Sequence, residues 1–270
     1  MPELPEVETT RCGIAPHLEG REVKSVTVRN PHLRRPVPEK LKHELPGRRI
    51  DAVIRRGKYL LIRAGDASLV IHLGMSGSLR LVPPDTPPRK HDHVDIQFSD
   101  QILRYHDPRR FGLVDWWPGD GSDHPLVASL GIEPLSPEFD GAWLFATTRG
   151  RRGAIKLLLM DAHMIVGVGN IYASESLFRA GIRPGTAAGR LSRARCGRLA
   201  EAIKTTLNDA IRAGGTTLKD FVNGHGEPGY FQNEVYVYGR TDQACRVCGS
   251  TIRQKILGQR NTFWCPHCQT

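Results

Sequence analysis

Two pairs of cysteines near the end of the chain constrain its folding more than any other feature. Each pair has two intervening residues, and sixteen residues separate the pairs, which are Cys245 and Cys248, then Cys265 and Cys268. This spacing is typical of a four-thiolate zinc site built on two turns and a hairpin. Four thiolates leave no open coordination position, so we expect one structural Zn²⁺. The alternatives are His267 as a ligand and a set of unrelated buried thiols.

The charge of the chain points to a class of partner. Among 270 residues, 38 Lys and Arg stand against 28 Asp and Glu, and the sequence pI is about 9.6. Such an excess favours binding to a phosphate backbone, although an ordinary basic protein is the alternative. We find no apolar run of about 18 residues and no basic segment followed by an apolar stretch at the N-terminus. We therefore expect a cytosolic protein without a membrane partner. A monomer is a separate expectation.

The first half of the chain predicts a β-sandwich. Short apolar runs alternate with Pro and Gly, as strands and turns do, at residues 23–28, 59–63, 68–72, 94–98 and 101–105. Residues 5–18 instead carry helix formers and predict one helix that the sandwich buries. We expect this domain to span residues 1–131.

The second half predicts helices and then a small metal-bound hairpin. A segment rich in Gly and Pro at 118–137 ends the strand pattern, and we expect a hinge or linker over 132–150. Helical spacing follows at 157–160, 173–179 and 191–213. We expect a helical domain over 151–230 that ends in a long polar loop, then a zinc finger over 236–270. The fold class is therefore multidomain α+β.

The N-terminus carries a candidate nucleophile. Removal of Met1 would leave Pro2 with a free secondary amine. Because the pKa of an α-amino group is about 8, part of this amine is neutral at pH 7. Glu3, Glu6 and Glu8 follow within a few residues. An amine beside carboxylates can attack a sugar carbon and form a Schiff base with the help of proton transfer. The alternative is an ordinary N-terminus with glutamates that face solvent or cap a helix.

Several blocks along the whole chain resemble the formamidopyrimidine-DNA glycosylase family. They occur in the family's order: MPELPEVE at 1–8, RGKYLL at 56–61, HLGMSG at 72–77, DPRRFG at 107–112, VGVGNIYASE at 166–175, and the terminal zinc finger. The resemblance implies a β-sandwich with a buried N-terminal helix, a helix-two-turns-helix domain and a zinc-finger hairpin. It also implies a bacterial base excision repair enzyme, a DNA glycosylase and abasic-site lyase.

The resemblance assigns catalytic roles to five residues. Pro2 resembles the family's nucleophile, which attacks C1′ of the damaged nucleotide and becomes the Schiff base, and Glu3 resembles its acid/base partner. Glu6 would position the amine or a water molecule. Lys58 would contact phosphate and take part in β-elimination, with an ordinary exposed strand lysine as the alternative. Arg260 resembles the zinc-finger arginine that binds phosphate and is linked to δ-elimination.

The resemblance also implies a set of side chains that fill the void left by an extruded nucleotide. Met75, Arg109 and Phe111 match this trio, which enters the duplex at the lesion and contacts the unpaired cytosine. Arg110 is adjacent to Arg109, and only the family register distinguishes the two arginines. The alternative for Met75 and Phe111 is an ordinary place in the hydrophobic core.

Three further residues match DNA contacts of the family. They are His91, Arg151 and Asn170. Asn170 belongs to the helix-two-turns-helix element, whose glycines permit close approach to phosphate. Many relatives have lysine where this chain has Arg151, a departure that keeps the charge but changes the phosphate geometry.

The implied substrate is double-stranded DNA with 8-oxoguanine, formamidopyrimidines or abasic sites. One rival is the endonuclease VIII branch, which prefers oxidised pyrimidines; Leu4 and the block at 107–112 favour the purine branch. A second rival is a non-catalytic zinc-finger DNA-binding protein, which has no need of Pro2, Glu3 or Lys58. The preference between the two purine lesions depends on the loop at about 217–230.

Overall fold

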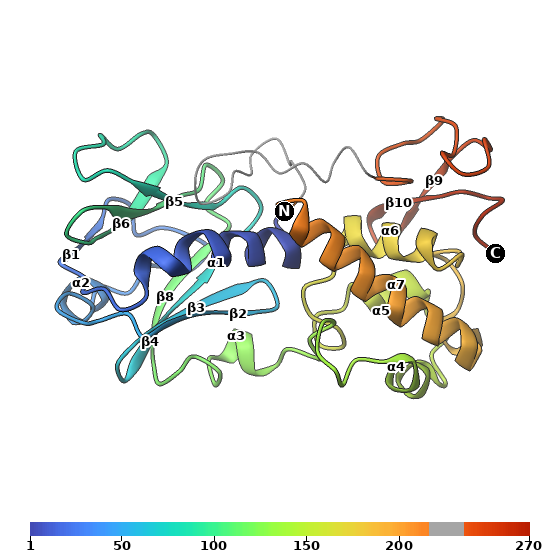
Figure 1. The fold of residues 1–270 in the computed structure, drawn as a ribbon, viewed down its shortest axis with the longest axis horizontal. Coiled ribbons are helices and arrows are strands. Elements are labelled where there is room, and N and C mark those ends of the chain that lie inside the picture. The colour runs from blue at the N-terminus through green and yellow to red at the C-terminus, as the bar shows by residue number, and fades with distance from the viewer. Residues whose placement is uncertain (216–234) are drawn as a thin grey trace. The chain divides into compact units, whose positions relative to one another are not determined.

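The computed structural model describes residues 1–215 and 235–270, and the chain divides into two compact units. Unit 1 comprises Met1–Ser129 and Ala213–Gln232, and unit 2 comprises Leu130–Arg212 and Asn233–Thr270 (Figure 1). The loop expected at 217–230 lies outside the described residues. Within the described residues, no helix is both long and apolar enough to cross a membrane.

Unit 1 contains two four-stranded antiparallel sheets, which confirms the expected β-sandwich. One sheet has the order β1 (Ser25–Val28), β6 (Asp92–Gln97), β7 (Ile102–His106) and β5 (Ser78–Val82). The other has the order β2 (Ala52–Arg56), β3 (Tyr59–Ala64), β4 (Ala67–His72) and β8 (Leu113–Pro118). Two short helices, α2 (Leu41–Glu44) and α3 (Pro125–Ala128), also belong to this unit.

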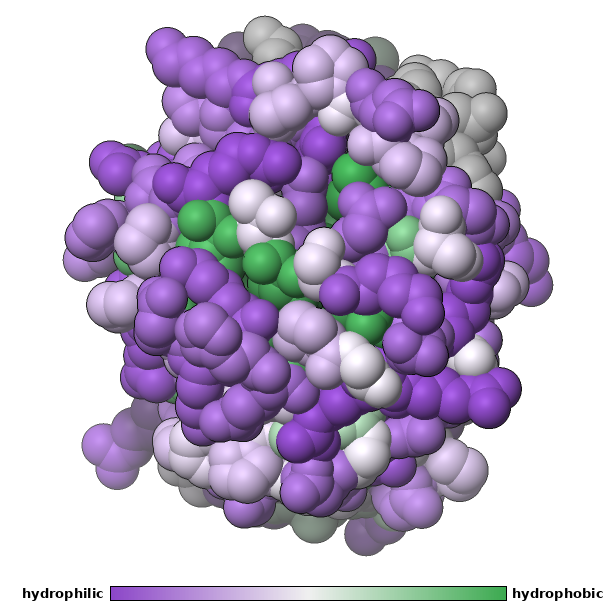
Figure 2. Space-filling view, turned by 90° about the vertical axis from the view of Figure 1, so that its left-hand side faces the viewer, coloured by the Kyte–Doolittle hydropathy of each residue, from purple (hydrophilic) through white to green (hydrophobic). Residues whose placement is uncertain are grey.

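All five expected strands are present, and β2, β5 and β8 were not anticipated. Charged residues interrupt the apolar pattern of these three strands: arginines in β2 and β5, and Asp115 in β8. Pairing with neighbouring strands stabilises them instead. The end of the molecule seen in Figure 2 is mainly hydrophilic, with a few hydrophobic residues at its middle.

Helix α1 (Leu4–Leu18) is buried in the core of unit 1, as expected. Its apolar residues recur at intervals of three, seven and four, so that Leu4, Val7, Ile14 and Leu18 share one face, and each is at most 1% exposed. This face joins one hydrophobic cluster with residues of both sheets, including Leu60 of β3 and Leu103 of β7. The packing fixes the first turn of α1, and with it the residues that begin the chain.

Unit 2 contains a group of helices and a two-stranded hairpin. The helices are α4 (Gly141–Thr148), α5 (Ile155–Leu159), α6 (Asn170–Arg179), the 3₁₀ helix η1 (Ala188–Arg190) and α7 (Arg193–Arg212). Strands β9 (Arg253–Leu257) and β10 (Arg260–Trp264) form the hairpin. Helix α4 falls inside the range 132–150 that we expected to be a linker. The Asp140 carboxylate caps it by accepting from the Trp143 N–H at 2.7 Å, and Leu144 is buried.

Candidate functional site

The N-terminal turn of α1 holds the residues expected around the nucleophile. Pro2 is buried directly before the helix, and Glu3 is its N-cap. The Glu6 carboxylate accepts a hydrogen bond from the Glu3 backbone N–H at 2.8 Å, and the Glu3 side chain accepts in turn from the Glu6 backbone. This capping box satisfies amides that a helix start leaves without partners. Glu3 is 3% and Glu6 0% exposed, so both carboxylates are held inside the protein.

The amino-terminal ammonium, which Met1 carries, lies in the electrostatic field of four expected site residues. Burial lowers the pKa of this ammonium; Glu3 and Glu6 oppose the shift, while Lys58 and Arg109 add to it. A lower pKa means a larger fraction of neutral amine at a given pH, which is what a nucleophile requires. The structure therefore brings Glu3, Glu6, Lys58 and Arg109 to the end of the chain that carries Pro2.

Lys58 occupies the turn between β2 and β3. Gly57 precedes it with a φ of +58°, a backbone conformation that a glycine adopts without a steric penalty. Lys58 is half-buried and its charge also acts on His72. The turn thus fixes the backbone position from which the Lys58 side chain extends.

Glu8 does not belong to this group. Its carboxylate binds Arg11 at 2.7 Å and Arg55 of β2 at 2.8 Å. Although burial opposes the shift, these two arginines lower the pKa of Glu8 below its ordinary value. Glu8 therefore joins α1 to β2 as an ion pair.

Met75 and Phe111 are among the exposed large hydrophobic residues, at 38% and 47%. Neither belongs to the core, which was the alternative reading of both. A Cβ added to Gly74 would lie 2.6 Å from backbone atoms of Phe111 and Gly112, so the two loops are in backbone contact. The Arg109 guanidinium lies 4.9 Å from the centroid of the Phe111 ring. The structure brings the expected trio onto adjacent loops, with apolar groups presented to solvent.

His72 fixes the start of the Met75 loop. The Gly74 N–H donates to His72 Nδ1 at 2.9 Å, so this nitrogen carries no proton. Burial, together with the charges of Lys58 and Arg34, lowers the pKa of His72 to about 4. The imidazole is therefore neutral near pH 7 and keeps its acceptor.

His91 lies at an irregular point of the sheet. Its φ of +74° is unusual for a residue with a side chain, and the β6–β7 pairing shifts register between Asp92 and Val94. The His91 carbonyl accepts from the Asp107 N–H at 3.0 Å. Partial burial and the neighbouring positive charges, Lys90 and His106 among them, lower the pKa of the His91 imidazole.

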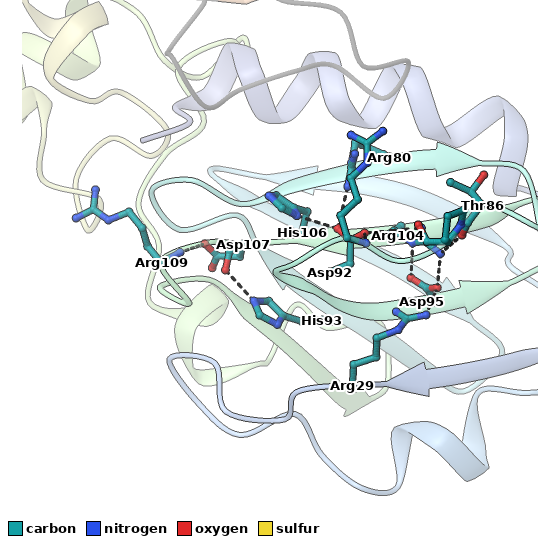
Figure 3. A network of polar contacts seen from close by, with 12 residues as sticks. Arg29, Arg80, Thr86, Asp92, His93, Asp95, Arg104, His106, Asp107 and Arg109 are labelled. Atoms are coloured by element: carbon teal, nitrogen blue, oxygen red, sulfur yellow. Dashed lines mark hydrogen bonds and ion pairs between the residues drawn. The ribbon is translucent and has the colours of Figure 1, made fainter.

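Buried ion pairs stabilise the sheet behind His91. The Asp92 carboxylate accepts from Arg80 and His106, both at 2.8 Å (Figure 3). Asp95 accepts from Arg104 and Arg29, as Figure 3 also shows. Asp92 also accepts from the Arg89 N–H at 2.7 Å, so its contacts connect the loop at 89–92 to the sheet.

Asn170 is the first residue of α6, and its preceding N-cap, Gly169, has no side chain to accept from the helix amides. No acidic residue occupies the first turn. Such a helix end attracts phosphate through its amides and its dipole. The Asn170 side chain donates to the Asn261 carbonyl of the zinc hairpin at 3.1 Å. The helix end and the hairpin therefore meet beside Arg260.

Arg151 lies on the surface of the same unit. Its guanidinium binds the Thr147 carbonyl at 2.9 Å and lies 3.4 Å from the Met164 sulfur. These contacts orient the side chain without neutralising its charge. Arg151 also lines a hollow of about 380 Å³ together with Arg152 and Leu157.

The four cysteines converge as their spacing predicted. Their sulfur atoms all lie within 4.8 Å of one another, and a tetrahedral zinc with bonds of about 2.3 Å needs similar separations. Backbone N–H groups of Val247 and Cys268 point at sulfurs of Cys245 and Cys265, at 3.5 and 3.4 Å. The donor set fits one structural zinc. Arg260 is exposed at the start of β10, after the turn that Gln259 makes with a φ of +59°.

Sequence reasoning missed two buried charged residues in unit 2. Lys156 is fully buried, and its ammonium donates to Thr262 Oγ1 at 2.7 Å and to the Asn261 carbonyl at 3.1 Å. Glu175 accepts from three successive N–H groups, those of residues 236, 237 and 238, at 2.8 to 3.0 Å. Burial nevertheless raises the pKa of Glu175. Two features of the sequence could have indicated them. Lys156 stands beside an apolar helical run, and Glu175 lies inside the block at 166–175.

Family models match nearly the whole chain. Residues 1–114 match the formamidopyrimidine-DNA glycosylase N-terminal domain, and residues 130–222 match its H2TH domain. Residues 242–270 match the zinc finger found in FPG and IleRS.

Known proteins resemble the chain over its full length. It is 57% identical to formamidopyrimidine-DNA glycosylase of Thioalkalivibrio sulfidiphilus and 56% identical to that of Stenotrophomonas maltophilia, with both chains covered completely. A crystal structure of the Lactococcus lactis FPG mutant G226P with Fapy-dG containing DNA gives a TM-score of 0.92 at 35% identity, covering 100% of each chain. The MutM (FPG) protein of Thermus thermophilus gives 0.88 at 38% identity, covering 99% of this chain and 98% of that one.

Proposed function

The chain belongs to the formamidopyrimidine-DNA glycosylase family, and on that premise we propose that it excises oxidised purines and cleaves the strand through a Schiff base on Pro2. It is a DNA glycosylase of base excision repair. The observation that carries the proposal is the first turn of α1, where Pro2 is buried beside the buried carboxylates of Glu3 and Glu6. Lys58 and Arg109 also act electrostatically on the amino terminus of this segment, which is that of Met1. Duplex DNA with 8-oxoguanine, a formamidopyrimidine or an abasic site is the proposed substrate.

The proposed reaction begins once Met1 is removed, because the Pro2 nitrogen is otherwise an amide. The Pro2 amine attacks C1′, the bond from C1′ to the base breaks, and the base leaves with a proton. Opening of the sugar ring gives an iminium ion on Pro2. Glu3 transfers protons in these steps, and Glu6 holds the Glu3 backbone in place. Lys58 contacts phosphate and assists β-elimination, after which δ-elimination releases the sugar.

The remaining site residues bind DNA in this proposal. Met75, Arg109 and Phe111 enter the duplex where the damaged nucleotide leaves it. The other contacts, made to the DNA backbone, are those of His91, Arg151, Asn170 and Arg260. The exposure of Met75 and Phe111 supports the first assignment, and the lack of an acidic residue in the first turn of α6 supports the contact by Asn170.

Zinc has a structural part in this function. Cys245, Cys248, Cys265 and Cys268 would hold it, and with four thiolate ligands it activates no water. The metal orders the hairpin that carries Arg260. We also propose the domain limits 1–131, 151–230 and 236–270, with 132–150 as the connection, and a place of action in the bacterial cytoplasm.

Trapping with borohydride tests the proposed nucleophile. The protein with Pro2 at its N-terminus should become covalently attached to a duplex that contains 8-oxoguanine opposite cytosine, because borohydride reduces the imine. Protein shown by mass spectrometry to retain a residue before Pro2 should give no adduct. Removal of that extension by a protease should restore trapping. Full excision by the extended protein would show that Pro2 is not the nucleophile.

A second substrate separates the purine branch from the pyrimidine branch. The same duplex with an oxidised pyrimidine in place of 8-oxoguanine should be processed more slowly. Faster processing of the pyrimidine would overturn the proposed specificity while leaving the Schiff base intact. Binding without trapping of either duplex would indicate a non-catalytic DNA-binding protein.

A further inference from the structure

Asp107 is a fully buried carboxylate that receives four hydrogen bonds, and none of the donors among the described residues is a Lys or Arg side chain. One oxygen accepts from the Ser76 hydroxyl at 2.9 Å and from the Arg109 backbone N–H at 3.2 Å. The other accepts from the Gly112 N–H at 2.9 Å and the Tyr105 hydroxyl at 3.2 Å.

Three of these donors come from the two loops that carry the exposed trio, and the fourth, Tyr105, belongs to β7. Ser76 directly follows Met75, while the backbone groups of Arg109 and Gly112 stand on either side of the Phe111 loop. Figure 3 shows that Asp107 binds the backbone of Arg109 while the guanidinium points away from the carboxylate. One carboxylate therefore holds both loops and leaves the Arg109 side chain directed elsewhere.

Two glycines make this arrangement possible. A Cβ at Gly112 would lie 1.8 Å from the Tyr105 hydroxyl. A Cβ at Gly77 would lie 2.2 Å from the Leu73 carbonyl oxygen and 2.9 Å from the Tyr105 hydroxyl. A side chain at Gly112 therefore requires movement of Tyr105, and a side chain at Gly77 requires movement of the Leu73 backbone as well. The glycines of the blocks at 72–77 and 107–112 thus make room for the hydroxyl that reaches Asp107.

The main chain of Asp107 extends the connection to His91. Its N–H donates to the His91 carbonyl at 3.0 Å, and its carbonyl lies 2.8 Å from His93 Nε2 (Figure 3). His91 and Arg110 both have positive φ, at +74° and +57°. Such backbone conformations persist only where surrounding contacts hold them. Asp107 contacts both the segment that contains His91 and the segment that contains Arg110.

We propose that Asp107 is a positioning residue that fixes the Met75 loop and the loop of Arg109 and Phe111 in one geometry, so that the three side chains enter the duplex together. The inference rests on the proposed function, because it concerns residues assigned there to the void. Asp95 provides the contrast within the same sheet. Its buried carboxylate pairs with Arg29 and Arg104, an ion pair whose partners lie outside the two loops.

The test measures how the three side chains of the trio enter the duplex, on a DNA from which no base is excised. A duplex carrying a tetrahydrofuran abasic analogue and an adjacent 2-aminopurine reports unstacking by its fluorescence at saturating protein. Asp107→Asn keeps the volume but places a donor where the carboxylate accepts, so it should lower the signal to the level of Phe111→Ala. Asp95→Asn should lower the thermal midpoint while the signal stays at the wild-type level.

Coupling between variants distinguishes positioning from general damage to the fold. Single-turnover excision of 8-oxoguanine should slow by about tenfold or more in Asp107→Asn, the effect expected when a buried acceptor is lost. The double variant with Phe111→Ala should be little slower than Phe111→Ala alone, since both remove the same step. Multiplied losses in the double variant, or a wild-type signal in Asp107→Asn, would overturn the proposal.

A milder variant keeps the test decisive if Asp107→Asn does not fold. Ser76→Ala removes one link between the loops and should lower the fluorescence signal and the excision rate in the same direction, with coupling to Phe111→Ala. A normal signal in folded Ser76→Ala would then count against the inference. Wild-type protein that unstacks the duplex but never excises the base would refute the proposed function and leave the role of Asp107 standing.

Discussion

The Glu6 carboxylate accepts the backbone N–H of Glu3 at 2.8 Å, so one side chain fixes the residue that follows the candidate nucleophile. Glu6→Ala would leave this buried N–H without its acceptor, and we expect the free energy of unfolding to fall by about 1–3 kcal/mol. Urea unfolding measures this loss. Excision should slow as well, because Glu3 loses its fixed position.

Glu6→Gln is the matched control for that variant. Glutamine keeps an acceptor oxygen at the third helical position, so the capping box and most of the stability should remain. Any loss of excision in Glu6→Gln then reports the missing charge beside the amine. Wild-type stability in Glu6→Ala would contradict the role assigned to this hydrogen bond.

His72 should make the stability of unit 1 depend on pH. Its pKa is about 4 in the folded protein and about 6.5 when unfolded, so only the unfolded chain binds the proton between these values. The stabilisation is complete above pH 6.5 and is lost as the pH falls to about 4. Its total size is on the order of 3 kcal/mol. Urea unfolding at pH 7, 5.5 and 4.5 measures the loss.

His72→Asn provides the comparison for this pH dependence. Asparagine can offer an acceptor to the Gly74 N–H but has no proton to gain in this range. The variant should therefore show a smaller loss of stability between pH 7 and 4.5 than the wild type. An unchanged pH dependence would show that other groups cause it.

Local patterns predicted the parts of the fold that local interactions create. The helix formers of residues 5–18 predict the N-terminal helix because helix propensity is a property of the local sequence. The cysteine spacing predicts the metal site in the same way. The β-sandwich and the zinc-finger hairpin were predicted from such local patterns, but three of the eight strands of the sandwich were not.

The contacts that position the site could not be predicted, because their partners are distant in sequence. Lys156 binds Thr262, which lies 106 residues away, and Glu175 binds the Val237 N–H, 62 residues away. Asp107 was visible only as part of a family block, and its partner Ser76 lies 31 residues earlier. Such pairs follow from tertiary packing, which periodicity does not encode.

Removal of zinc should weaken DNA binding and strand cleavage together. The metal orders a hairpin whose small core contains Val237, Ile252 and Phe263, so its loss should release Arg260 from a fixed position. Chelation and Cys248→Ser should have the same effect. Cys12→Ser, which alters an exposed cysteine of α1, should leave both activities unchanged. Normal cleavage by protein shown to be free of metal would contradict this account.

The last prediction separates residues that fill the void from residues that bind phosphate. Phe111→Ala should slow single-turnover excision from duplex DNA, where unstacking costs about a few kcal/mol, yet leave the salt dependence of binding unchanged. Arg260→Ala should lower the slope of log affinity against log salt by about one and weaken binding to undamaged DNA too. Ile256→Ala, which truncates another exposed apolar residue, should change neither quantity. Binding at several salt concentrations and single-turnover excision measure both. Wild-type excision by folded Phe111→Ala would remove Phe111 from the trio, because a side chain that fills the void cannot be lost without cost.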